Sequence, residues 1–447
     1  MARASYPLFE SEPPEPKLAA EVLEHNFREI RPPLGDESAL REAQRCYYCD
    51  YDAPCVRGCP TRIDIPSFIK LIAQGKPVEA GRVIVQSNIL GASCARVCPV
   101  DMLCEKHCIC TTLHERPIPV GRLQRVAMDS LMQSGEQPFE RAPATGRTIA
   151  VVGAGPAGIS AAFELAKRGH EVRVLEKDAE PGGLDRYGIA EYKVRAPFVR
   201  EELDWLLRIG GVALEHVGQP VGSAELRALM GKHSAVLLAL GLATTRRLGI
   251  AGEGLAHVVD ALRFIRQIKM GPLADVPVGR HVVVIGAGNT AIDAATQARR
   301  LGAESVLLVH RGGRHEVSCT PEEFALSLAD GCEWRWFAEP VEILGEDRVR
   351  AVLLRDTRHG GISEVAADHV VKAIGQTPHE WLRDIAGLAL EPNQTLKVDP
   401  ITWMTSVPGL FAAGDCVLRA KEVVHAVYEG KCAALAIDGW LAPSASR

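Results

Sequence analysis

Two stretches of the chain repeat one pattern of hydrophobic and polar positions. Residues 147–177 read RTIAVVGAGPAGISAAFELAKRGHEVRVLEK, and residues 280–311 read RHVVVIGAGNTAIDAATQARRLGAESVLLVHR. In each, a short apolar run leads into a glycine-rich turn, an amphipathic stretch and a second apolar run. This order predicts a buried strand, a helix and a second parallel strand. The chain is therefore predicted to contain two βαβ units.

The first 145 residues follow a different pattern. They contain short helical periodicities, such as DIPSFIKLIAQGKPVEAGRVI at 64–84, and a polar loop at 133–146 separates them from the first βαβ unit. The predicted fold class is α/β, with an α-helical, cysteine-rich domain over 1–145 followed by two Rossmann-like dinucleotide-binding domains.

The first glycine turn has the spacing of a dinucleotide-binding site. Gly153, Gly155 and Gly158 form a GxGxxG pattern, and Glu176 ends the following strand. The first glycine makes the tight turn, the second lets the backbone approach a pyrophosphate, and the third lets helix pack on strand. The carboxylate accepts hydrogen bonds from a ribose diol. We predict a dinucleotide site here that also includes Ala157.

The second glycine turn lacks the acidic residue. Arg311 stands where the ribose-reading carboxylate is expected. An arginine there can hold a 2′-phosphate, which favours NADPH, but it can equally be a solvated surface residue, so the choice between NADH and NADPH stays open. The residues predicted to bind the nicotinamide cofactor, besides Arg311, are Gly286, Ala287, Gly288, Asn289, Thr290 and Gly375.

Two dinucleotide sites in one chain need two dinucleotides, and FAD with a nicotinamide cofactor is the usual solution. Asp415 in GLFAAGDC suits a hydrogen bond to the flavin ribityl chain. The arrangement resembles the two-dinucleotide flavoprotein family of glutathione and thioredoxin reductases. That resemblance implies an FAD domain split into 146–260 and 373–447, with the NAD(P)H domain inserted at 261–372. We also predict FAD contacts at Gly183, Leu184, Gly414 and Val423.

The chain has no redox dithiol near the predicted flavin, since residues 184–194 contain no cysteine. Nine of its 13 cysteines instead lie between residues 46 and 110, in the blocks RCYYCDYDAPCVRGCP and GASCARVCPVDMLCEKHCIC. Such clustering in a reducing compartment predicts metal binding. Zinc and [4Fe–4S] clusters both use four cysteines, but a flavin without a dithiol needs a one-electron outlet, which favours iron–sulfur.

Composition and net charge limit the classes of partner that the protein is expected to bind. The net charge is −5 with no basic tract, which argues against nucleic acid. No apolar run approaches the ~18 residues that span a bilayer, and the N-terminus has no signal-peptide pattern. We expect a cytoplasmic protein that binds neither nucleic acid nor membrane.

The two cysteine blocks, followed by PIPVGRLQR and GAGPAGISAA, are similar to the small, NAD(P)H-oxidising subunits of bacterial dihydropyrimidine dehydrogenases. The small subunit of glutamate synthase is a wider relative. The resemblance implies two [4Fe–4S] clusters, one on Cys46, Cys49, Cys55 and Cys108 and the other on Cys59, Cys98, Cys104 and the side-chain oxygen of Gln124. It also implies a basic residue between flavin and cluster, here Lys193. Spacing alone would favour Cys94 over Gln124, and Cys94 and Cys110 keep no assigned role.

Two features favour the pyrimidine branch. The gap between Cys98 and Cys104 is longer than glutamate synthase subunits usually have, and those subunits tend to place Glu at position 124. Two features depart from the branch. The gap between Cys49 and Cys55 is one residue longer than usual, and Lys193 replaces the arginine of the eukaryotic enzyme, which keeps the charge but loses the planar fork.

The function implied is that of an electron-input subunit. It would oxidise NAD(P)H, with NADH favoured, and pass electrons through FAD and two clusters to a catalytic partner that carries FMN and [4Fe–4S] clusters and reduces uracil and thymine. The family suggests a heterotetramer. The rivals are glutamate synthase or a ferredoxin as acceptor and, in another class, a zinc-stabilised docking module on a degenerate flavoprotein.

Overall fold

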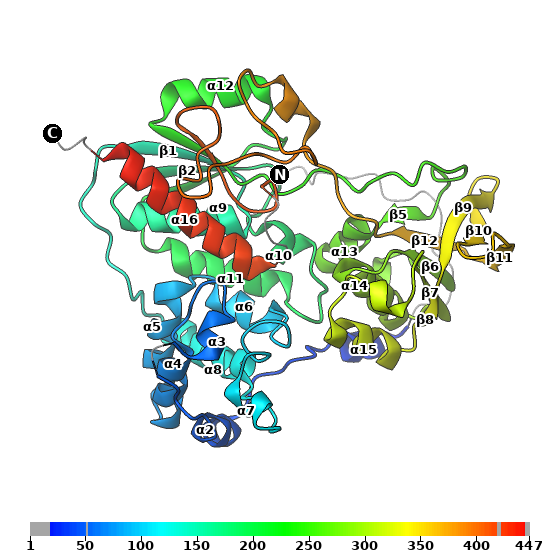
Figure 1. The fold of residues 1–447 in the computed structure, drawn as a ribbon, viewed down its shortest axis with the longest axis horizontal. Helices are drawn as coiled ribbons and strands as arrows, with labels where there is room; N and C mark the ends of the chain where they lie inside the picture. The colour runs from blue at the N-terminus through cyan, green and yellow to red at the C-terminus, as the bar shows by residue number, and fades with distance from the viewer. Residues whose placement is uncertain (1–17, 51, 418–421, 443–447) are drawn as a thin grey trace. The chain divides into compact units, whose positions relative to one another are not determined.

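The computed structural model describes residues 18–50, 52–417 and 422–442 (Figure 1). It divides into two compact units. The larger unit holds residues 29–189, 193–244 and the part of the chain after 375, and the smaller unit holds 18–28, 190–192 and 245–375. The cysteine blocks and the first βαβ unit therefore belong to one compact body, and the second βαβ unit belongs to the other.

Helices form the first part of the larger unit. The apolar pattern at 64–84 gives two helices because Gly75, at a φ of 74°, follows the first and Pro77 begins the second. Gly81 lets the second of these helices approach the last one, since a Cβ there would lie 2.6 Å from the Cβ of Leu131. The helices are α2 Asp36–Gln44, α3 Pro54–Arg57, α4 Ile65–Ala73, α5 Pro77–Ser87, α6 Gly91–Val97, α7 Ile109–Thr112 and α8 Val120–Gln133.

A five-stranded parallel sheet forms the second part of the larger unit. Its order is β13-β4-β1-β2-β3, so the last strand of the chain pairs beside β4. The strands are β1 Thr148–Val152, β2 Glu171–Glu176, β3 Val212–His216, β4 Ala235–Leu238 and β13 Leu410–Ala412. The helices are α9 Pro156–Lys167, α10 Gly183–Tyr187, α11 Ala196–Leu207, α12 Ser223–Lys232, the short η3 Glu380–Asp384 and α16 Val423–Leu441.

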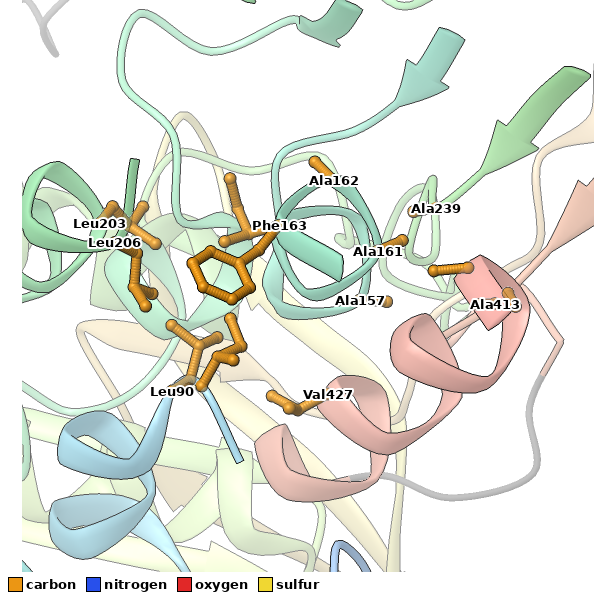
Figure 2. Close-up of a cluster of buried hydrophobic side chains, with 14 of the residues drawn as sticks. Leu90, Ala157, Ala161, Ala162, Phe163, Leu203, Leu206, Ala239, Ala413 and Val427 are labelled. Atoms are coloured by element: carbon orange, nitrogen blue, oxygen red, sulfur yellow. The ribbon is translucent and has the colours of Figure 1, made fainter. Parts of the chain in front are cut away.

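One hydrophobic core runs through both parts of the larger unit. Figure 2 shows Leu90, just before α6, beside Phe163 of α9 and Leu203 and Leu206 of α11. All four side chains are at most 2% exposed. The cysteine-rich helices are thus packed into the core of the sheet domain, and burial of this apolar surface stabilises their attachment.

The smaller unit contains the second βαβ unit. A parallel sheet of order β5-β12-β6-β7-β8 carries an antiparallel sheet of order β11-β10-β9 in the same unit. The strands are β5 Val258–Asp260, β6 His281–Ile285, β7 Ser305–Val309, β8 Glu333–Arg335, β9 Ala338–Gly345, β10 Val349–Asp356, β11 Ile362–Ala366 and β12 His369–Lys372. The helices are α1 Ala20–Asn26, α13 Ala261–Met270, η1 Leu273–Asp275, α14 Asn289–Arg300, η2 Arg314–Glu316 and α15 Pro321–Ala329.

Residues 18–28 precede the cysteine blocks in sequence but pack with the smaller unit. Leu23 and Phe27 are 3% exposed and join its core, and the side chain of Asn26 donates to the carbonyl of Arg300 at 2.9 Å.

The two predicted βαβ units and the α/β class are confirmed, with strand, helix and strand in the predicted order in both units. Within the described ranges, no helix is long and apolar enough to cross a bilayer.

A buried carboxylate joins the two parts of the larger unit. Glu202 of α11 is 0% exposed, and it accepts hydrogen bonds from the backbone of Ala92 at 2.9 Å and from the backbone and hydroxyl of Ser93 at 3.0 and 2.5 Å. These donors lie in the first turn of α6. Burial raises the pKa of Glu202 to about 7, although the Ser93 hydroxyl lowers it.

We expect Glu202→Gln to change how stability depends on pH. A carboxyl whose pKa rises from 4.5 to about 7 on folding contributes stability that is complete below about pH 4.5 and lost as pH rises through 7. That contribution, about 3 kcal/mol, is absent from the variant. Calorimetric melting at pH 5, 6, 7 and 8 should therefore show the advantage of the wild type shrinking as pH rises. Glu201→Gln, an exposed neighbour, is the control, and an advantage that stays constant with pH would contradict the assignment.

Candidate functional site

The first glycine turn is shaped as a cradle. Gly153 has a φ of 104°, and a Cβ there would lie 2.3 Å from the carbonyl oxygen of Ala239. A Cβ at Gly158 would lie 1.9 Å from the carbonyl oxygen of Gly153. At Gly155, in contrast, the nearest neighbour of a Cβ is the Cα of Gly183 at 3.8 Å. Two of the glycines are needed for packing, and the third leaves space at the N-terminus of α9, where a pyrophosphate fits.

The predicted ribose-reading acid lies at this turn. Glu176 ends β2, is 8% exposed, and accepts hydrogen bonds from the backbone of Ala154 at 2.7 Å and of Asp178 at 2.9 Å. Burial raises its pKa, against the effect of these two donors. These two hydrogen bonds fix the carboxylate beside the turn.

Residues from the C-terminal part of the chain complete this site. Gly414 follows β13, and a Cβ there would lie 2.9 Å from the Cβ of Ala157. Burial raises the pKa of the adjacent Asp415, so a hydroxyl donor such as a ribityl group would stabilise its carboxylate. Sequence reasoning missed Glu429 of α16, a 5% exposed carboxylate that accepts from the backbone of Gly414 at 2.8 Å. Glu429 fixes the turn that presents Asp415.

The other predicted flavin residues lie in the same unit. Gly183 begins α10 and approaches Gly155, and Leu184, the next residue, is 39% exposed. Val423 is the first residue of α16. Lys193 is half-buried in the segment between α10 and α11. The donors, acids and open glycine turn of this unit fit an FAD.

The first predicted cluster set is brought together. Burial raises the pKa of Cys55 to about 12, and Cys46, Cys108 and Cys49 raise it further. Burial likewise raises the pKa of Cys46, with added contributions from Cys108 and Cys49. Cys108 comes from the second block and the others from the first, so the two blocks cross over in space. Thiolates packed this closely are stable only beside a cation, and iron supplies one.

Cysteines of the second predicted cluster set also lie near one another, and Cys94 is an additional candidate ligand beside them. A hydrogen bond with the Cys94 thiol, together with burial, holds the pKa of Cys98 well above its usual range, and Cys104 and Cys59 raise it further. Cys94 therefore lies beside this set.

Gln124 reaches the same region from α8. It is 7% exposed, and its amide nitrogen donates to the carbonyl of Gly91 at 2.7 Å. The amide oxygen is the group of this side chain that remains to act as a ligand. Cys94 therefore contacts a member of the set, whereas Gln124 is held at the first residue of the same helix, α6.

Three further observations concern the cysteines and possible metal ligands. Burial raises the pKa of Cys110 to about 11, and its neighbour Cys108 raises it further, so Cys110 lies at the edge of the first set. Within the residues that the structure describes, no three His, Cys, Asp or Glu side chains are close enough to hold a single metal ion. The extra residue between Cys49 and Cys55 falls on a loop that includes position 51, which is outside the described residues.

The second glycine turn lies in the smaller unit and has a similar form. A Cβ at Gly286, where φ is 136°, would lie 2.3 Å from the carbonyl oxygen of Ala373, whereas at Gly288 the nearest atom is the Ser318 hydroxyl at 3.3 Å. Asn289 begins α14, and its side chain accepts from the backbone of Thr320 at 3.0 Å. The turn residues Ala287 and Thr290 flank this position.

Other predicted and unpredicted residues lie near this turn. Arg311 is exposed just after β7, and Gly375 accepts a hydrogen bond from the backbone of Arg246 at 2.9 Å. Sequence reasoning missed Asp293 of α14, which is 4% exposed and accepts from the backbone of Ala190 at 3.3 Å. The hydroxyl of Tyr192 also bonds Thr296 at 2.7 Å, so residues 190–192 are held on α14. No sequence periodicity marks such a contact.

Two known protein families match different parts of the chain. Residues 147–430 match the pyridine nucleotide-disulphide oxidoreductase family, and residues 23–136 match the family of dihydropyrimidine dehydrogenase domain II with a 4Fe-4S cluster. The NAD-dependent dihydropyrimidine dehydrogenase subunit PreT of Salmonella typhimurium is 32% identical over 94% of this chain and 98% of its own length. The glutamate synthase [NADPH] small chain of Azospirillum brasilense is 33% identical over 96% and 94%.

Solved structures support the fold of the nucleotide-binding part. The thioredoxin reductase of T. acidophilum matches with a TM-score of 0.53 and 23% identity over 66% of this chain and 98% of its own. FprA of Mycobacterium tuberculosis matches with a TM-score of 0.54 over 67% and 85%. The chain belongs to the pyridine nucleotide-disulphide oxidoreductase family, in the branch of NAD(P)H-dependent electron-transfer subunits that join a flavin domain to an iron–sulfur domain.

Proposed function

We propose that the protein is the electron-input subunit of a dihydropyrimidine dehydrogenase. It oxidises NADH or NADPH at FAD and sends the electrons through two [4Fe–4S] clusters to a separate catalytic subunit that carries FMN and further clusters. That partner reduces uracil and thymine to their 5,6-dihydro forms, and the complex is a heterotetramer. The protein is cytoplasmic.

One observation carries the proposal. Cysteines from two separate blocks lie close enough to raise one another's pKa values, and these cysteines lie in the same compact unit as the flavin cradle. A metal module that only docked a partner would not need to share a core with a flavin domain. Electron transfer does need it, because the two redox groups must stay close and fixed.

The chain's own residues position the reactants. An FAD bound here would supply a hydride acceptor for the nicotinamide, and iron–sulfur clusters would supply one-electron acceptors. Hydride transfer requires no acid or base from the protein, so binding and orientation are its contribution. The second glycine turn holds the nicotinamide cofactor, with Asn289 fixed by Thr320. Lys193 supplies positive charge on the larger unit, where it favours the reduced flavin.

The glutamate synthase small chain is the second candidate role, because a relative with that name is as similar as the dihydropyrimidine dehydrogenase subunits. The electron-input chemistry is the same in both, and only the acceptor differs. Gln124 and the length of the Cys98–Cys104 gap favour the pyrimidine partner. A ferredoxin as acceptor would use the same chain without a stable partner.

Anaerobic affinity purification from the native host, with the bound partner identified by mass, tests the proposed role. We expect an FMN-containing partner, and uracil-dependent oxidation of NADH by the complex. A very large glutamine-using partner would instead assign the chain to glutamate synthase. Oxidation of NADH that uracil does not stimulate would also contradict the pyrimidine role.

We expect Gly155→Val to lose FAD without unfolding. The backbone there has a φ of −74°, which valine adopts, and the nearest atom to a Cβ is 3.8 Å away. The valine fills only the space assigned to the pyrophosphate, so the affinity for FAD should fall more than about tenfold. Equilibrium dialysis with FAD and the melting temperature of the apoprotein measure the two effects. Gly158→Ala is the contrast, because its Cβ collides with the carbonyl of Gly153 and should lower stability itself. Unchanged FAD affinity in Gly155→Val would exclude this turn.

Variants of Gln124 and Cys94 test which of these side chains is the fourth ligand of the second predicted cluster set. If the Gln124 oxygen binds iron, Gln124→Leu should lose roughly four of about eight irons per chain, whereas Cys94→Ser should keep them all. Gln124→Glu retains an oxygen and should keep the cluster with a changed electron paramagnetic resonance spectrum. Iron analysis of the three proteins, purified without oxygen, gives the answer. Loss of iron in Cys94→Ser alone would make Cys94 the ligand.

A further inference from the structure

The segment that follows β7 is tied to the second glycine turn. The backbone of Ser318 and of Cys319 donates to the carbonyl of Ala287 at 3.1 and 2.9 Å, and the backbone of Thr320 donates to Asn289 at 3.0 Å. In a dinucleotide-binding unit, the adenosine ribose lies between the glycine turn and the end of the next strand. Residues 310–318 therefore border the place where the ribose 2′ position is read.

An acid folds back onto this segment. The carboxylate of Glu316 accepts a hydrogen bond from the backbone of Gly313 at 2.6 Å. A Cβ on Gly312 would lie 2.6 Å from the same carboxylate oxygen. Gly312 directly follows Arg311, the residue at the expected position of the ribose-reading acid. The loop thus brings a negative charge to the strand end, although the strand itself does not carry one.

The charges around Glu316 favour an uncharged 2′ hydroxyl over a phosphate. Burial lowers the pKa of His310, which leaves the imidazole neutral at pH 7 despite the opposing effect of Glu316. The guanidinium of Arg314 lies 4.9 Å from the ring centre of Phe324, a cation–π contact. Gly312 and Gly313 carry no side chain that could bind a phosphate. Arg311, Arg314 and His315 are the basic residues of this segment that compete with Glu316, and all three are exposed to solvent.

We propose that Glu316 is the residue that selects NADH over NADPH, by accepting a hydrogen bond from the adenosine ribose and repelling a 2′-phosphate. The inference rests on the proposed function, because it assumes that the second glycine turn binds the nicotinamide cofactor. A carboxylate supplied from a loop replaces the one that most NADH sites carry at the end of the strand.

The test is anaerobic stopped-flow bleaching of the flavin in the full holoprotein, with NADH and NADPH as separate reductants. Wild type, Glu316→Gln and Glu333→Gln are compared. Glutamine keeps an acceptor for the backbone of Gly313 but removes the charge, and Glu333 is an exposed acid at the start of β8 that serves as the control. We expect the wild type to bind NADH more tightly, and the ratio of the two apparent dissociation constants to shift at least about tenfold towards NADPH in Glu316→Gln alone.

The possible results distinguish a failure of the inference about Glu316 from a failure of the proposed function. An equal loss of affinity for both cofactors in Glu316→Gln would mean that the carboxylate only shapes the loop, and it would overturn the inference. A wild type that prefers NADPH, or a ratio that does not move, would do the same while leaving the proposed function intact. If neither cofactor bleaches the flavin of the wild type, the proposed function itself fails, and the inference fails with it.

Discussion

The buried carboxylate of Glu202 is the contact on which the architecture of the larger unit depends. It holds the first turn of α6, and the same helix carries Cys94 and ends at Cys98, while the carbonyl of Gly91 receives the Gln124 side chain. Glu202 lies on α11 of the sheet domain, so one side chain couples the frame of a cysteine set to the frame of the flavin cradle. The shared apolar core around Leu90 and Phe163 excludes water from this junction. Groups that exchange electrons must be held at a fixed short separation, and this junction provides the rigidity.

The burial of the cysteine side chains imposes a second constraint on the structure. A thiolate in a buried site needs a nearby positive charge, and the pKa values of Cys55, Cys98 and Cys104 are all raised by burial and by neighbouring cysteines. The protein alone offers these sets too little compensation. A cluster of iron ions supplies it, so the affinity of the site for iron and the stability of the fold are linked. The predicted flavin site has the opposite electrostatic preference, because it suits an anion rather than a cation. Its free backbone donors and open glycine turn suit a negatively charged pyrophosphate.

The sequence predicted most of the fold because its strongest signals are local. The strand, glycine turn and helix at residues 148–167 follow from periodicity and from Gly153 and Gly158, where a Cβ would collide with a backbone carbonyl. The pairing of Cys108 with the first block depended on resemblance, since spacing along the chain does not reveal which blocks cross over. Glu202, Asp293 and Glu429 could not be predicted at all. Each is an acid on a helix whose partners lie far away in sequence, and only the packed structure shows that they are buried. Glu316 was hidden for a related reason, because a loop acid that folds back leaves no periodic signal.

We propose that a flavin and two iron–sulfur clusters share one chain. The most direct test is to analyse iron, acid-labile sulfide, zinc and flavin in the wild-type protein purified without oxygen. We expect about eight irons, about eight sulfides and one FAD per chain, with no stoichiometric zinc. One or two zinc ions with no labile sulfide would contradict it, and the cysteine-rich helices would then be a structural metal module on a flavoprotein.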